Sequence, residues 1–229
     1  MGARSTVTPL AVAVLALLDE RPRHPYDMHQ TLLERGMDRL VKVRPGSLYH
    51  TVARLTGCEL IRADGVDRDG RRPERTTYRI TAAGRAALRD RVAELLRTPA
   101  AEYPEFPLAL AEAHNLPKEQ VRELLAQRRA QLGGDLDEIR ALGVWAGDHA
   151  LPRRYWMVLT YLRTMREAEI GWVDALLGDL DDGTLAWDRF DPGTGRRIAV
   201  PIDAWATAAR ADPPPLPAEP GATPRTRSS

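Results

Sequence analysis

Cysteine, lysine and phenylalanine are scarce in this 229-residue sequence, which has one Cys, two Lys and two Phe. A single cysteine excludes an internal disulfide, so nothing points to an oxidising compartment. The apolar run at residues 10–18 is nine residues long, far short of a membrane span. Asp19, Glu20 and Arg21 follow it at once, where a signal peptide needs small residues for cleavage. We therefore expect a cytoplasmic protein that does not associate with membranes.

The residue patterns of catalysis and metal binding are missing too. The five histidines show no His-x-x-x-His and no Cys–His spacing, so we expect no metal site. The sequence has no Gly-x-Ser-x-Gly, no phosphate-binding loop and no dinucleotide fingerprint. We interpret Cys58 as a small buried hydrophobic residue rather than a redox switch. The expectation is a protein that is not an enzyme and needs no cofactor.

Charge is distributed unevenly along the chain. Residues 1–97 carry 18 Lys and Arg against 12 Asp and Glu, a net charge of +6. Residues 98–229 carry 15 against 20, a net charge of −5. This asymmetry suggests that the first part faces a polyanion, although a solvated and mildly basic domain would carry the same charge.

Three helices are expected in the first part of the chain, at residues 10–18, 25–35 and 47–58. Thr8 and Pro9 favour a helix start, because the hydroxyl can cap free N–H groups and the proline ring suits the first turn. The first helix is apolar on every side and must be covered all round. Gly36 is typical of a helix end, and Pro45 with Gly46 predicts a break before the third helix.

A change of periodicity then predicts a β-hairpin. Strands are expected at residues 60–63 and 76–80, joined by a turn-rich loop at 67–73. Thr81 is expected to cap a fourth helix. The apolar face of that helix is formed by Leu88, Val92, Leu95 and Leu96. The order of helices and hairpin over residues 1–97 is typical of a winged helix-turn-helix domain with a two-stranded wing.

Residues 98–182 predict a helical region. A proline-containing linker over 98–107 leads to a short helix at 107–114, and longer helices begin after Pro117 and at Pro152. Gly133-Gly134 predicts a kink or a break in the first long helix. The second has a coiled-coil-like seam formed by Tyr155, Val158, Leu162, Met165, Glu169, Trp172 and Leu176. Beyond this region, we expect a small β-hairpin within residues 183–210 and a disordered tail over 211–229.

Several segments of the first domain resemble PadR-family transcriptional regulators. Residues 45–55, followed by Leu60-Ile61, are similar to the recognition helix of that family. Residues 70–85 are similar to its wing and the helix cap that follows, and Pro25-Tyr26-Asp27-Met28 is similar to its Gly-Tyr-Glu-Ile. There are two departures: Glu59 stands where the family has a glycine before Leu-Ile, and Pro25 stands where it has a glycine before Tyr.

The resemblance implies a mainly α fold that forms a homodimer. In the family the C-terminal helices pair across a two-fold axis and often embrace the N-terminal domain of the partner, so residues 98–182 would be the dimerisation and effector domain. The family also implies repression of transcription that is relieved by a small aromatic or lipophilic effector.

The resemblance and the charges together predict a set of side chains that contact double-stranded operator DNA. These are Tyr26, Lys42, Arg44, Ser47, Tyr49, His50, Arg54, Arg71 and Arg72. Lys42 and Arg44 precede the positive end of the third helix, where Ser47 can donate to a phosphate. Tyr49 and His50 are expected to reach the DNA backbone or base edges, with half-buried packing as the other interpretation for Tyr49. Arg71 and Arg72 at the wing tip suit the minor groove or a phosphate, although a solvated turn would look the same.

Trp145, Trp156 and Trp172 are open to two interpretations. Their rings could line a pocket for an aromatic effector, or they could serve core and dimer packing. The first function hypothesis is accordingly a ligand-responsive repressor. An alternative is a winged-helix module that contacts protein instead of DNA, because fold alone does not establish function.

Overall fold

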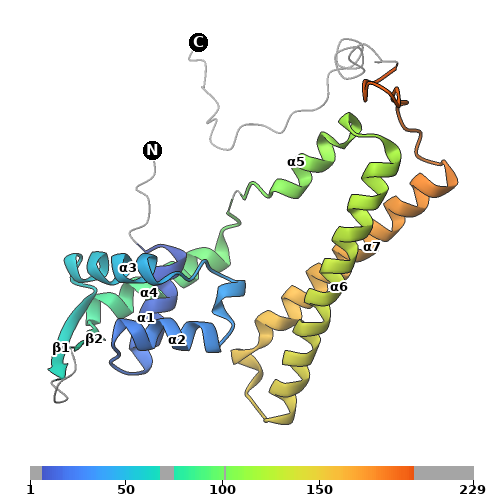
Figure 1. Ribbon diagram of the computed structural model, residues 1–229. Coiled ribbons are helices and arrows are strands. Elements are labelled where there is room, and N and C mark those ends of the chain that lie inside the picture. The colour runs from blue at the N-terminus through green and yellow to red at the C-terminus, as the bar shows by residue number, and fades with distance from the viewer. Residues whose placement is uncertain (1–6, 68–74, 101, 199–229) are drawn as a thin grey trace, which may run out of the picture. The chain divides into compact units, whose positions relative to one another are not determined.

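The computed structural model describes residues 7–67, 75–100 and 102–198 (Figure 1). The described part is mainly helical, with seven α-helices, three short 3₁₀ helices and one two-stranded antiparallel sheet. The chain divides into two units, Met1–Tyr103 and Pro104–Ser229, each with its own hydrophobic cluster.

Helix α1 (Pro9–Glu20) forms the centre of the N-terminal unit. Thr8 caps it by accepting a hydrogen bond from the backbone N–H of Ala11 at 3.4 Å, and Pro9 occupies its first turn, as the sequence predicts. Leu10, Ala11, Ala13, Val14, Leu15, Leu17 and Leu18 are all buried. The expected burial of this helix on nearly every side is therefore confirmed within a single chain.

Helix α2 (Pro25–Glu34) packs against α1 and ends where the sequence predicts. Gly36 adopts a left-handed conformation with a φ of 64°, which a glycine reaches without steric cost. A short 3₁₀ helix, η1 (Met37–Arg39), follows directly. Met28 and Leu32 point from α2 into the core, which fixes the opposite face of the helix toward solvent.

Helix α3 (Pro45–Gly57) begins earlier than the sequence analysis expects. The predicted break at Pro45 and Gly46 is wrong, because both residues lie in the first helical turn. Pro45 has no N–H to lose a hydrogen bond there, and its ring fixes a helical φ, so it starts the helix as Pro9 does in α1. Leu48, Thr51, Val52 and Leu55 form the buried face of α3.

The end of α3 is closed by a Schellman motif. The backbone N–H of Leu60 donates to the carbonyl of Leu55 at 3.0 Å, and that of Glu59 donates to the carbonyl of Thr56 at 2.9 Å. Glu59 sits in the left-handed region with a φ of 57°, a conformation that favours glycine. The chain thus makes this helix-ending turn without a glycine at the left-handed position.

Strands β1 (Ile61–Asp67) and β2 (Arg75–Ile80) form the predicted wing hairpin. Ile61 pairs with Ile80 at its base, and a bulge shifts the register between Ala63 and Gly65. A third extended segment joins the sheet at Arg23, whose backbone exchanges hydrogen bonds of 3.0 and 2.9 Å with Tyr78. The wing is therefore hydrogen-bonded to the loop that precedes α2.

Helix α4 (Ala82–Arg97) returns from the wing and packs on α1. Thr81 caps it by accepting from the N–H of Gly84 at 3.0 Å, as predicted. Gly84 is buried so close to the preceding chain that a Cβ would lie 2.1 Å from the carbonyl oxygen of Leu60. The predicted apolar face is only half used: Leu88 packs against the core, whereas the last two turns leave Val92, Leu95 and Leu96 exposed.

The C-terminal unit is built on two long helices, α6 (Lys118–Asp148) and α7 (Met157–Asp182), that pack along each other (Figure 1). Helix α5 (Glu105–Ala111) and the 3₁₀ helix η2 (Ala113–Asn115) precede them, and η3 (Arg153–Tyr155) joins them. Helix α6 runs without a break through Gly133 and Gly134, contrary to one of the two outcomes expected there. Packing against α7 outweighs the roughly 1 kcal/mol that each glycine costs a helix.

The stripe of α7 that faces α6 differs from the predicted seam. Val173 and Leu180 are the fully buried residues of α7. Of the predicted seam, Val158, Leu162, Glu169 and Leu176 are half-buried, whereas Tyr155, Met165 and Trp172 are exposed. Helix α7 therefore has two apolar stripes, and the described residues cover only one of them.

Residues 184–198 lie against the corner between η2 and α6. The indole N–H of Trp187 donates to the carbonyl of Leu116 at 2.8 Å, and Arg197 donates to the carbonyl of His114 at 2.6 Å. One antiparallel bridge, between Phe190 and Arg197, closes a small turn in this segment.

Candidate nucleic-acid interface

The solvent face of α3 is the centre of the candidate interface. Tyr49 is 50% exposed, so the half-buried packing considered for it stays open, and His50 is exposed beside it. Gly46 and Ala53 lie on the same face and add little bulk. Tyr26, in the first turn of α2, is 52% exposed. A narrow helix surface with two projecting rings is a shape that can enter a DNA groove.

The N-terminus of α3 is open to an anion. Its N-cap residue, Arg44, makes no side-chain capping hydrogen bond, so the cap leaves the first N–H groups of the helix available. Lys42, Arg44 and Ser47 are all exposed around this end. Two cations, one hydroxyl and the positive end of the helix dipole thus meet at one place, which suits a backbone phosphate.

Arg54 is only partly available to DNA. Its side chain is half-buried, and its Nη2 donates to the hydroxyl of Thr8 at 3.1 Å. That hydroxyl is the cap of α1, so Arg54 ties the recognition helix to the start of the central helix. This hydrogen bond helps to orient α3 on α1.

The predicted wing contacts Arg71 and Arg72 lie outside the described residues. The described strands of the hairpin end at Asp67 and begin again at Arg75. The sequence prediction for them stays a prediction.

An ion-pair network that the sequence analysis missed holds α2 against α1. The carboxylate of Glu20 accepts from Arg23 at 2.9 Å and from Arg35 at 2.5 and 2.9 Å. The hydrogen bond and charge of Arg35 hold the pKa of Glu20 below its ordinary value, and Glu20 in turn raises the pKa of Arg35. Arg23 is buried, at 7% exposed, and also donates to the hydroxyl of Thr31 at 3.1 Å. This network fixes the start of α2, and hence Tyr26, relative to the core.

His24 is a second positioning residue that sequence reasoning missed. It is the N-cap of α2, and its Nδ1 accepts from the backbone N–H of Tyr26 at 3.1 Å. The available signal was its place directly before Pro25, since a polar side chain before a helix-opening proline is the pattern recognised at Thr8.

The three tryptophans proposed for an effector do not share one site within the chain. Trp145 is 53% exposed and stacks on His149 with ring centroids 4.4 Å apart, near the end of α6. Trp156 precedes α7 and donates its indole N–H to the carbonyl of Leu151 at 2.9 Å. Trp172 lies 16 residues further along, about 24 Å at 1.5 Å per residue. It meets the ring of Phe106 edge-on, with centroids 6.3 Å apart. Only Trp145 and Trp156 are near the same end of the α6–α7 pair.

Cys58 is exposed at the C-cap of α3, so its interpretation as a buried hydrophobic residue is wrong. The turn places the side chain of Leu55 in the core and that of Cys58 in solvent. Among the residues that the structure describes, no group of three or more His, Cys, Asp or Glu is placed to hold a metal ion. None of the described helices is both long and apolar enough to cross a membrane.

Comparison with known proteins relates this architecture to one group. Residues 14–90 match the family model described as the transcriptional regulator PadR-like family. Bacillus subtilis PadR in complex with operator DNA is similar with a TM-score of 0.65 and 18% sequence identity, covering 74% of this chain and 96% of that chain. The same protein in complex with p-coumaric acid gives a TM-score of 0.62, 18% identity and coverage of 75% and 98%. The Vibrio cholerae virulence activator AphA is similar with a TM-score of 0.57 and 21% sequence identity, covering 76% of this chain and 99% of that chain. No curated protein matches the sequence.

Proposed function

We propose that this chain is a PadR-like transcriptional regulator that binds specific DNA sequences and whose helix α3 enters the major groove; the match of residues 14–90 to that family supports the proposal. The observation that carries the proposal is the open, cationic N-terminus of α3 beside an exposed face with Tyr49 and His50. A structural neighbour with a similar fold has been solved with operator DNA. The regulator would act on chromosomal DNA in the cytoplasm.

Each predicted contact has a role in this proposal. Lys42, Arg44 and Ser47 hold a phosphate at the start of α3, and Tyr26 approaches the backbone from α2. Tyr49 and His50 reach base edges, and Arg54 adds a phosphate contact beside Thr8. The wing tip brings Arg71 and Arg72 to the minor groove or a neighbouring phosphate. Phosphate contacts set affinity and register, whereas the ring side chains of α3 supply sequence discrimination.

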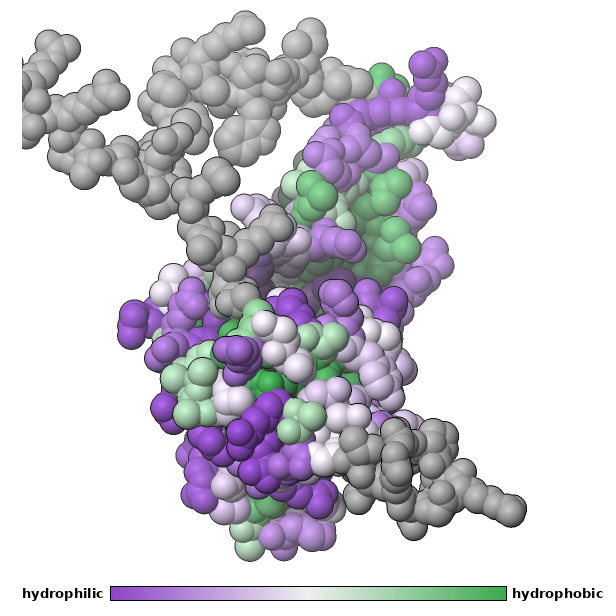
Figure 2. Space-filling view, turned by 90° about the vertical axis from the view of Figure 1, so that its left-hand side faces the viewer, coloured by the Kyte–Doolittle hydropathy of each residue, from purple (hydrophilic) through white to green (hydrophobic). Residues whose placement is uncertain are grey.

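The regulator works as a homodimer. The C-terminal unit leaves many large apolar side chains in solvent, among them Trp145, Tyr155, Tyr161 and Met165, which is more than a stable monomer usually exposes. Figure 2 also shows hydrophobic residues at the surface in the upper part of the view, which belongs to this unit. A second copy covering this surface would present two α3 helices to a palindromic operator, with half-sites about 34 Å apart.

The effector is a small aromatic or lipophilic compound that relieves repression. A neighbour with a similar fold has been solved with p-coumaric acid. In this chain Trp145 and Trp156 offer aromatic surface near one end of α6 and α7. Trp172 belongs to a separate cluster with Phe106, so it would line the effector site only if a second subunit brought the two regions together. The effector changes DNA affinity by favouring one dimer geometry over another.

Binding to duplex DNA tests the proposal. Fluorescence anisotropy would be measured with the region upstream of the protein's own gene and with duplexes selected from a random pool, at several salt concentrations. Changing Lys42 and Arg44 to Ala removes two phosphate contacts per subunit, so the slope of log K against log salt falls by about 3.6 for a dimer, at about 0.9 per contact. Arg89→Ala, at an exposed position of α4, is the matched control and keeps the slope. Binding that no selected duplex improves, or a slope that the double variant leaves unchanged, would favour a module that contacts protein.

A further inference from the structure

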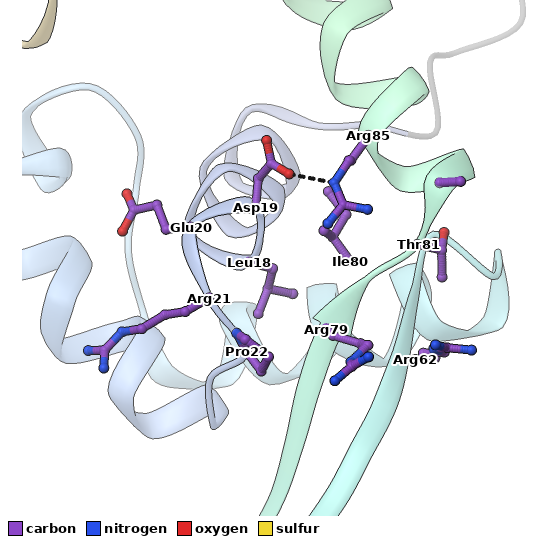
Figure 3. Close-up of a pocket in the computed structure, with 11 residues that line it drawn as sticks. Leu18, Asp19, Glu20, Arg21, Pro22, Arg62, Arg79, Ile80, Thr81 and Arg85 are labelled. Carbon is purple, nitrogen blue, oxygen red and sulfur yellow. Dashed lines mark hydrogen bonds and ion pairs between the residues drawn. The ribbon is translucent and has the colours of Figure 1, made fainter.

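The N-terminal unit has a pocket that the DNA-binding proposal does not use. It is a shallow hollow of about 450 Å³ at the base of the wing (Figure 3), here called the wing-base pocket. Its walls come from three places: the end of α1 with Leu18 and Pro22, the first pair of the hairpin with Arg62 and Arg79, and the start of α4. A volume of this size is sufficient for a small organic ligand.

Four arginines line the wing-base pocket, and their anionic neighbours do not satisfy all of them. The arginines are Arg21, Arg62, Arg79 and Arg85. Asp19 accepts from Nε of Arg85 at 2.7 Å, as Figure 3 shows, and Asp64 pairs with Arg79. Glu20 also lines the pocket, but its carboxylate holds Arg23 and Arg35. Within the described part of the chain, neither Arg21 nor Arg62 forms an ion pair.

The position of Arg62 is unfavourable without a counter-ion. Arg62 and Arg79 are direct partners across the two strands of the hairpin. Like charges directly opposite each other destabilise a strand pair, and the carboxylate of Asp64 pairs with Arg79 alone. An anion between the two guanidinium groups would replace their mutual repulsion by attraction to the shared anion, since each group can donate two parallel N–H groups to one oxyanion.

The wing-base pocket lies away from the surface proposed for DNA. Arg62 is five residues from the last residue of β1, about 16 Å along the strand from the start of the wing tip. Helix α3 contributes no residue to the pocket. The ligand of these cations is therefore a different species from the operator.

We propose that the wing-base pocket binds a small organic anion through a phosphate or carboxylate group held by Arg62 and Arg79. Arg21 adds positive charge, and the start of α4 directs the positive end of its helix dipole toward the same hollow. The lining is mainly polar and charged, so the remainder of the ligand is small and largely hydrophilic. Because Ile80 and Thr81 link the pocket directly to α4, occupancy stiffens the joint between the wing and that helix.

Calorimetric titration of the full chain with inorganic phosphate and, separately, with benzoate tests the proposal without DNA. The titrations compare the wild type, Arg62→Gln and the control Arg89→Gln at constant ionic strength. We expect wild type and the control to bind one of the probes in a saturable manner, and Arg62→Gln to bind about tenfold more weakly, the loss of one charge-assisted contact. Binding of phosphate would identify a phosphate-bearing ligand. Binding of benzoate without binding of phosphate would identify a ligand with a carboxylate group.

Thermal melts give a second readout. Without a probe, Arg62→Gln should melt at or above the wild-type temperature, because the substitution removes the repulsion with Arg79. Addition of the probe should raise the melting temperature of the wild type more than that of the variant. The proposal fails if neither probe binds, or if Arg62→Gln binds as the control does. It also fails if Arg62→Gln lowers the salt slope of operator binding, because the cations would then belong to the DNA contact.

Discussion

Glu59 allows a sharp test of how α3 ends. Its φ of 57° places a residue with a Cβ in the left-handed region, which costs about 1–2 kcal/mol relative to the right-handed one. Replacing it by Gly removes that cost but adds about 0.5–1 kcal/mol of backbone entropy to the unfolded chain. The net expectation for Glu59→Gly is a gain of about 0–1.5 kcal/mol in the free energy of unfolding, which corresponds to a rise in Tm of up to about 6 °C for a chain of this size.

The assay is thermal denaturation of the full chain, followed by circular dichroism. Glu59→Ala serves as the control, because it removes the carboxylate and keeps the Cβ. The backbone carbonyl of Glu59, which accepts from the hydroxyl of Thr81 at 2.9 Å, is present in all three proteins. Wild type and Glu59→Ala should melt within about 1 °C of each other. If Glu59→Gly melts below Glu59→Ala, the left-handed turn is not a source of strain and the reasoning is wrong.

Three other positions give predictions: two glycine substitutions change stability in opposite directions, and one glutamate substitution has an effect that depends on pH. Gly84→Ala should destabilise the fold by about 2–3 kcal/mol, because the new Cβ must displace the backbone at Leu60. Gly178→Ala, with open space around it in α7, should stabilise the fold by up to about 1 kcal/mol. Denaturant titration of both variants measures the two changes. Glu20→Gln should cost about 1–3 kcal/mol, because Arg23 stays buried without its counter-ion and partial exposure of Glu20 reduces the loss. Because folding lowers the pKa of Glu20, its contribution is complete above the ordinary value of 4.5 and is lost as the pH falls through the folded value. Urea unfolding at neutral and acidic pH should therefore show a smaller difference between Glu20→Gln and wild type in acid.

Local rules were sufficient for the helix starts and the wing. Thr8 and Thr81 were predicted as caps, and both accept the expected backbone hydrogen bond. The same rule, applied consistently, would have placed Pro45 inside α3, because a proline that follows an extended residue starts a helix as readily as it ends one. The error came from reading Pro45 together with Gly46 as a turn.

Features that depend on distant partners could not be predicted. Glu20, Arg23 and Arg35 have no distinctive spacing, and only the packing of α2 on α1 brings them together. In α7 the sequence shows apolar residues around much of the helix, so periodicity alone could not tell the stripe that α6 covers from the one that contains Trp172. Of the kink or break predicted at Gly133-Gly134, the break is absent for a similar reason, since a helix with a long partner tolerates poor local propensity.

The pairing of Arg23 with Tyr78 has a consequence for regulation. The loop that precedes α2 is hydrogen-bonded to strand β2, so α2 and the hairpin of the N-terminal unit are held together as one stiff block. A ligand that acts on such a block has little freedom to bend it. In the proposed homodimer the adjustable quantity would be the separation between the two blocks. Amide protons at residues 23 and 78 should exchange with solvent at the same slow rate whether or not operator is bound.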